Sequence, residues 1–164
     1  MPITPFHFGL GAALHAAAPR RISFLSFCVA NVLIDVESLV NLIQHRHPVH
    51  AFLHSYVGAA LMVSATLALF LALRWFAARF WLPNLLRWQD LTPRAVAIGA
   101  ALGAFSHIVF DSIMHADMRP LQPFSDANAL LGMLSLVELH LLCLGLAVLG
   151  VAVLCLRHLH PGAD

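Results

Sequence analysis

Residues 95–114 read AVAIGAALGAFSHIVFDSIM, an apolar run that carries one histidine and one aspartate. At a rise of about 1.5 Å per residue, a helix of about 20 residues crosses the hydrocarbon core of a bilayer. His107 and Asp111 are four residues apart and therefore share one face of such a helix. A charged side chain at the centre of a membrane helix costs roughly 2.5–3.5 kcal/mol, so it persists mainly where it has a partner or a function. The run predicts a membrane span that carries part of a site.

The composition extends this prediction to the whole chain. Of its 164 residues, 60% are hydrophobic and 10% are charged, and the mean hydropathy is +0.84. A soluble domain usually has about 25% charged residues. Three further apolar runs are long enough to cross a bilayer, at residues 22–43, 51–73 and 129–156. We therefore predict an all-α, polytopic membrane helix bundle that forms one integral membrane domain over residues 1–164.

A fifth apolar segment, residues 4–18, is shorter than the others and ends before a proline. Its length fits either a short spanning helix or a re-entrant one that packs against the long helices. It lacks a basic residue ahead of its apolar stretch, so we expect no cleaved signal peptide. The bundle is thus expected to contain four long transmembrane helices and one short N-terminal helix.

The arginines lie mostly on one side of the predicted spans. Two precede the first long span, four lie between the second and third, and one follows the fourth, whereas only Arg46 and Arg119 lie in the opposite loops. Because short cytoplasmic loops are enriched in arginine and lysine, this bias places the C-terminus in the cytoplasm. The 74–94 loop also holds all three tryptophans and is predicted to be an amphipathic segment on the inner membrane surface. The net charge of +1 gives no reason to expect nucleic acid or an acidic partner. As an integral membrane protein, the chain is expected to contact membrane lipid.

With this orientation, ionisable side chains from several spans lie at one level near the outer face. Asp35 lies past the middle of the first long span, His54 near the start of the second, and Glu138 is buried about two turns inside the fourth. His7 joins them if residues 4–18 run inward. Histidine with aspartate or glutamate from several helices is the ligand chemistry of a zinc-type site. A buried metal centre is the leading interpretation, and interhelical hydrogen bonds that only lock packing are the alternative.

Several neighbours of these candidates have open roles. Glu37 points about 200° away from Asp35 on a regular helix, so both reach one site only if the helix is broken or surrounded there. His50 and His54 are expected on one face at the start of the second long span. The loop after the third span contains two prolines and either caps the site, contributing His115 or Asp117, or is simply solvated. His50, His115 and Glu138 are left as possible ligands.

Five motifs in this order resemble a known family: Pro5-x-His7-x-x-x-Gly11, Asp35-x-Glu37, a histidine- and arginine-containing tract that ends in His54-Ser55, Ser106-His107-x-x-x-Asp111, and Pro120-Leu121-Gln122-Pro123-Phe124. The chain from His7 to Phe124 resembles the small bacterial inner-membrane proteins identified as membrane-bound metal-dependent hydrolases (YdjM-like). That family looks distantly similar to zinc-dependent phospholipase C. The resemblance implies a multi-pass protein of the bacterial inner (plasma) membrane that binds Zn²⁺ or another divalent metal such as Mn²⁺. It implies as metal ligands His7, Asp35, Glu37, His54, His107 and Asp111.

Three functions remain open from the sequence. The first is a metal-dependent hydrolase at the outer side of the membrane, acting on a lipid or phosphoester, with Glu37 or Asp117 as general base. The alternative is a proton- or metal-ion-transporting protein that uses the same residues. Transport needs access from both sides, yet residues 67–73 and 95–102 contain no ionisable group, which favours a one-sided site. The third is a structural protein locked by polar contacts.

Overall fold

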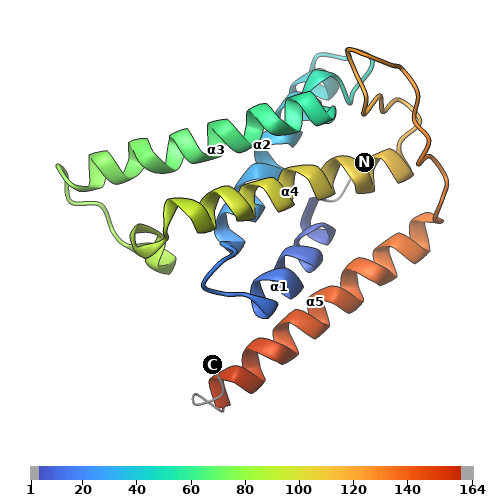
Figure 1. Ribbon diagram of the computed structural model, residues 1–164. Coiled ribbons are helices and arrows are strands. Elements are labelled where there is room, and N and C mark those ends of the chain that lie inside the picture. Colours follow the sequence, from blue (N-terminus) through green and yellow to red (C-terminus); the bar gives the residue numbers. More distant parts are fainter. Residues whose placement is uncertain (1–3, 160–164) are drawn as a thin grey trace.

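The computed structural model describes residues 4–159, and every regular element in that range is a helix (Figure 1). Four helices are long and apolar enough to cross a membrane: α2 (Phe24–Ile43), α3 (Tyr56–Ala77), α4 (Pro93–Met114) and α5 (Leu136–Leu159). The remaining elements are shorter: η1 (Thr4–Phe6), α1 (Phe8–Ala17), η2 (Phe52–His54) and η3 (Leu85–Asp90), the three η elements being 3₁₀ helices. The predicted bundle of four long helices and one short N-terminal helix is confirmed. Residues 1–3 and 160–164 of the predicted domain lie outside the described residues.

Helix α4 is the centre of the bundle. It packs against α2 and α3, while α1 packs along α5 and also contacts α2 (Figure 1). The connections gather at two ends of the molecule. The α2–α3 and α4–α5 connections lie together at the upper right of Figure 1, whereas the α1–α2 turn and the α3–α4 loop lie toward the lower left. The first of these ends carries the ionisable residues described below.

Two glycines set the spacing between α4 and α2. A Cβ atom on Gly103 would lie too close to the carbonyl oxygen of Phe27, and one on Gly99 would meet the carbonyl oxygen of Ser23 in the same way. Small residues at a helix interface let two backbones approach closely, as is common in membrane bundles. This close approach brings Asn31 of α2 within hydrogen-bond distance of His107 on α4.

The predicted second span, residues 51–73, begins too early. Helix α3 starts at Tyr56, because Ser55 has an extended backbone and its hydroxyl accepts a hydrogen bond from the N–H of Gly58 at 3.0 Å. This is the arrangement of a serine N-cap. The residues before the cap form a loop and the short helix η2 instead. The expectation that His50 and His54 share one face of a regular helix is therefore wrong.

The start of α5 corrects the prediction for Glu138. The fourth span was expected to begin at residue 129, which would bury Glu138 two turns inside, but α5 begins at Leu136 and Glu138 is exposed in its first turn. The carboxylate of Glu138 accepts hydrogen bonds from the N–H of Ser135 at 2.8 Å and from its hydroxyl at 2.7 Å. The hydroxyl of Ser135 in turn accepts from the N–H of Glu138 at 3.2 Å. This reciprocal pair is a capping box, so Glu138 helps to cap the N-terminus of α5.

The α3–α4 connection places aromatic and basic side chains at the end opposite to the ionisable residues. Helix α3 continues to Ala77, and η3 follows after a short loop. Trp81 is 90% exposed, whereas the ring of Trp88 packs edge-on against Phe70 with the ring centroids 6.5 Å apart. An interfacial location of this loop stays a prediction.

Candidate metal centre

Four ionisable side chains from three elements converge at one end of the bundle. Asp35 comes from α2, His54 from η2, and His107 and Asp111 from α4; each offers a ligand atom, and these atoms all lie within 4.8 Å of one another. The side chains of both histidines and of Asp111 are fully buried, whereas that of Asp35 is 18% exposed. We call these four residues the metal group.

The ligand atoms of the metal group face one another at short distances. Nε2 of His107 lies 3.2 Å from Oδ2 of Asp111 and 3.3 Å from Oδ1 of Asp35. Nε2 of His54 lies 3.4 Å from the same atom of Asp35 and 3.6 Å from Oδ2 of Asp111. Among the described residues, Nε2 of His107 and both oxygens of Asp111 have no hydrogen-bond partner. Since buried polar atoms are normally satisfied, this arrangement shows that the group could hold a divalent metal.

A hydrogen bond from the neighbouring helix orients the ring of His107. Its Nδ1 lies 2.9 Å from Oδ1 of Asn31, whose amide nitrogen donates to the carbonyl of Phe27 at 2.8 Å. Because that amide nitrogen is the donor, Oδ1 of Asn31 is left to accept the Nδ1–H of His107. The lone pair of His107 then lies on Nε2 and faces the carboxylates. Histidines that bind metals usually donate their other ring N–H to a partner of this kind.

Ser38 lies beside His54 in the same way that Asn31 lies beside His107. Its hydroxyl donates to the carbonyl of Val49 at 3.2 Å, and its oxygen lies 3.4 Å from both ring nitrogens of His54. It can therefore accept the Nδ1–H and leave Nε2 to the carboxylates. Nothing in the sequence pattern shows which rings Asn31 and Ser38 of α2 meet.

His7 borders the metal group without being one of the four. It precedes α1 and is 2% exposed. Its Nε2 lies 3.5 Å from Oδ1 of Asp111, and its Nδ1 lies 3.2 Å from Nδ1 of His107. The side chain thus contacts the group on the side of α1, and its role as a ligand stays a prediction.

Glu37 and Asp117 lie outside the metal group and bind backbone N–H groups. Oε2 of Glu37 accepts from Leu53 at 2.6 Å, which ties α2 to η2. Oδ2 of Asp117 accepts from the N–H groups of Val49 at 3.0 Å and His50 at 3.1 Å. Burial alone would raise the pKa of Asp117, but hydrogen bonds from His50 hold that pKa below its ordinary value. The predicted catalytic roles of both residues, and the ligand role of Glu37, stay predictions.

Replacing Asn31 by alanine tests the orientation of the His107 ring. Without Asn31 the Nδ1–H of His107 loses its acceptor at 2.9 Å, and loss of such a partner typically lowers metal affinity about 10–100-fold. We expect this weakening in a competition titration of the purified protein against a chelating dye. Asn84→Ala, the same change at the opposite end of the bundle, should leave the affinity unchanged. Equal affinity in both variants would show that Asn31 does not position a ligand.

None of the protein-family models, curated proteins or solved structures with which the chain was compared matches it. The candidate metal centre therefore rests on the distances, burial and hydrogen bonds of its own side chains. The resemblance to the YdjM-like family stays a prediction.

Proposed function

We propose that this protein is a membrane-embedded, metal-dependent hydrolase that acts on a lipid or other phosphoester at the outer side of a bacterial inner membrane. The observation that carries the proposal is the buried metal group at one end of an apolar helix bundle. Burying two histidines and two aspartates inside a membrane costs free energy, so such residues persist mainly where they have a function. The resemblance to the YdjM-like hydrolases adds support from the order of the motifs.

The distances within the metal group are compatible with Zn²⁺. Nitrogen and oxygen ligands at about 2.0–2.1 Å from a tetrahedral zinc ion lie about 3.3–3.4 Å from one another. The four measured contacts between histidine nitrogens and aspartate oxygens span 3.2–3.6 Å. Two imidazoles and two carboxylates are a donor set that zinc accepts, and Mn²⁺ is the alternative because it prefers carboxylate ligands.

The residues of the site would have different roles in hydrolysis. The metal, when bound, would lower the pKa of water toward about 7 and polarise a phosphoryl oxygen. Asn31 and Ser38 hold the two rings in place, and the burial of His54 and His107 keeps bulk water away from them. Asp35 is the partly exposed member of the group and lies on the side from which a substrate can approach.

Glu37 is the better candidate for the general base. Its Oε2 holds the N–H of Leu53, but no hydrogen bond to its other oxygen occurs among the described residues. Both oxygens of Asp117 are engaged, since Oδ1 lies 2.9 Å from Nδ1 of His50 and Oδ2 accepts two backbone N–H groups. Glu37 can therefore take a proton without releasing the loop that it holds.

The change Glu37→Gln tests this assignment, because glutamine keeps an acceptor for Leu53 but cannot take the proton. The protein is reconstituted in vesicles that contain phosphatidic acid or phosphatidylglycerol, and release of soluble phosphate or headgroup is followed with and without a chelator. We expect chelator-sensitive hydrolysis in the parent and a rate about 10²–10⁴-fold lower in the variant, at equal metal content. An unchanged rate would remove Glu37 as the base. Absence of chelator-sensitive hydrolysis across phosphoester lipids would speak against the hydrolase.

The position of the metal group along the helices favours a one-sided site over a transport path. Asp35, His107 and Asp111 lie in the second halves of α2 and α4. In their first halves, Ala30 and Ala100 are fully buried in the apolar core cluster. The buried polar residues in the first half of α2, Ser26 and Asn31, are not ionisable, whereas a path for protons or metal ions would need ionisable groups there.

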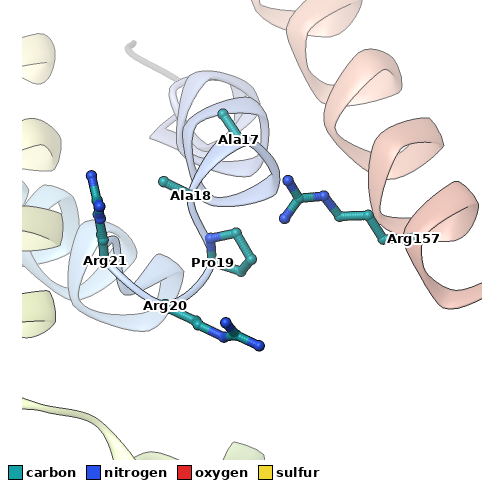
Figure 2. Close-up of a pocket in the computed structure, with 6 residues that line it drawn as sticks. All are labelled: Ala17, Ala18, Pro19, Arg20, Arg21 and Arg157. Atoms are coloured by element: carbon teal, nitrogen blue, oxygen red, sulfur yellow. The ribbon is translucent and has the colours of Figure 1, made fainter. Parts of the chain in front are cut away.

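The opposite end of the bundle carries arginines. A pocket of about 330 Å³ lies there. In Figure 2, Arg157 reaches from α5 toward the turn that contains Pro19. Arg20 and Arg21 of the same turn also line it. Since basic side chains are enriched at the cytoplasmic face, this supports an orientation with the end of α5 in the cytoplasm and the metal group toward the outer leaflet.

A further inference from the structure

We propose that the centre binds two divalent cations, the second held by His50, His115 and Asp111. These three residues form another group in which each offers a ligand atom and all of these atoms lie within 4.8 Å of one another. The inference rests on the proposed metal centre and extends it, because Asp111 belongs to both groups. We call this set the second group.

Both histidines of the second group have a buried nitrogen without a hydrogen bond. Nε2 of His50 and Nε2 of His115 are inaccessible to solvent and have no hydrogen-bond partner among residues 4–159. His50 as a whole is 5% exposed. The two rings are stacked, with centroids 4.2 Å apart and an angle of 22° between their planes. Two buried imidazole nitrogens left without partners beside a carboxylate are the donor set of a cation site.

Asp117 fixes the ring of His50 for this role. Its Oδ1 lies 2.9 Å from Nδ1 of His50, while its Oδ2 is held by the N–H groups of Val49 and His50. A carboxylate whose position is set by the backbone accepts the Nδ1–H, so the lone pair of the ring lies on Nε2. The same carboxylate–histidine pairing orients the ligands of many metal sites. Asp117, which the sequence suggested as a base, is thus a positioning residue here.

Asp111 links the two groups. It is fully buried, and neither of its oxygens has a hydrogen-bond partner among the described residues. The rings of His50 and His54, one from each group, have centroids only 4.8 Å apart. A carboxylate with two oxygens can therefore serve neighbouring cations, as in the two-metal sites of phosphatases and nucleases.

The carboxylates of the site can offset the charge of two cations. Asp35, Asp111 and Asp117 bring three negative charges and Glu37 brings a fourth, which together equal the four positive charges of two divalent ions.

Metal stoichiometry of the full chain in detergent tests the inference. The protein is stripped with a chelator, titrated with Co²⁺ followed by its visible absorption, and analysed for bound metal after dialysis. We expect two ions per chain in the parent and one in His115→Ala, with the first ion bound as tightly as before. Asp117→Asn, a milder change, should weaken the second ion about 10–100-fold and leave the first unchanged. His158→Ala, at the opposite end, is the control and should keep both ions.

The outcomes separate this inference from the proposed metal centre. One ion per chain in the parent, unaffected by His115→Ala and by Asp117→Asn, would overturn the second group and leave the first intact. Two ions in both the parent and His115→Ala would also overturn it, because the second ion would then lie elsewhere. No bound ion in the parent would overturn both proposals. Circular dichroism of each variant establishes that it is folded, and Asp117→Asn decides the matter if His115→Ala does not fold.

Discussion

Replacing Asp111 by asparagine is expected to abolish metal binding at both positions while the helical bundle stays folded. Asp111 is fully buried and belongs to both groups, so no other residue can replace its negative charge between the cations. Removing a residue that only orients a ligand lowers metal affinity about 10–100-fold. Loss of the shared ligand itself should therefore lower it more than about 100-fold. Metal content by mass spectrometry and helix content by circular dichroism measure the two expectations. Asp126→Asn, at a side chain 73% exposed, is the matched control.

The same variant separates a metal ligand from a structural residue. If Asp111 serves the metal, removing its charge in the presence of a chelator should leave stability unchanged or raise it, because a buried carboxylate without its cation is costly. A residue that only locks the packing would instead lower the melting temperature with or without metal. Retention of metal by Asp111→Asn would contradict the assignment of this residue.

The second large effect is expected from Gly103→Ala, which should destabilise the bundle and weaken the metal centre together. The added Cβ would clash with the carbonyl oxygen of Phe27 and lie 2.9 Å from the amide nitrogen of Asn31. Overpacking of this kind typically costs about 1–3 kcal/mol. Since Asn31 orients His107, the shift of α2 that relieves the clash should also lower metal affinity.

Gly145→Ala is the matched control for this prediction. It lies in α5, and its added Cβ would meet no described atom within 4 Å apart from its chain neighbours and the backbone of its own helix. Alanine has a higher helix propensity than glycine by about 1 kcal/mol, so this variant should melt at or slightly above the temperature of the parent. Thermal melting in detergent compares the two substitutions. If Gly103→Ala melted like Gly145→Ala, the close approach of α4 to α2 would not matter for stability.

The apolar runs and the four-residue spacings determined what the sequence could predict. A run such as residues 95–114 is long enough to identify a membrane helix from composition alone, and helical periodicity puts His107 and Asp111 on one face. Charge asymmetry then placed Asp35 and His54 at the same level, where the structure brings them together. These inferences depend on local spacing and on the thickness of a bilayer.

The contacts that the sequence did not predict depend on loop geometry and helix caps. Ser55 caps the N-terminus of α3, and Ser135 caps that of α5 by pairing with Glu138, so both helices begin later than the apolar runs that contain them. A hydropathy profile does not detect a helix cap, because the apolar run continues on both sides of the capping residue. The pairing of Asp117 with His50 joins two loops that are 67 residues apart in the chain, and no periodic pattern encodes such a contact.

The most direct test of the metal centre is elemental analysis of the detergent-purified protein beside its His107→Ala variant. We expect stoichiometric zinc or manganese in the parent, as purified or after refilling with either ion, and its loss in a variant that keeps its helix content. Nε2 of His107 lies 3.2 Å from Oδ2 of Asp111 and 3.3 Å from Oδ1 of Asp35, so the variant loses one of the two nitrogen ligands of the metal group. A parent protein that binds no divalent metal even after refilling would show that these side chains do not form a metal centre.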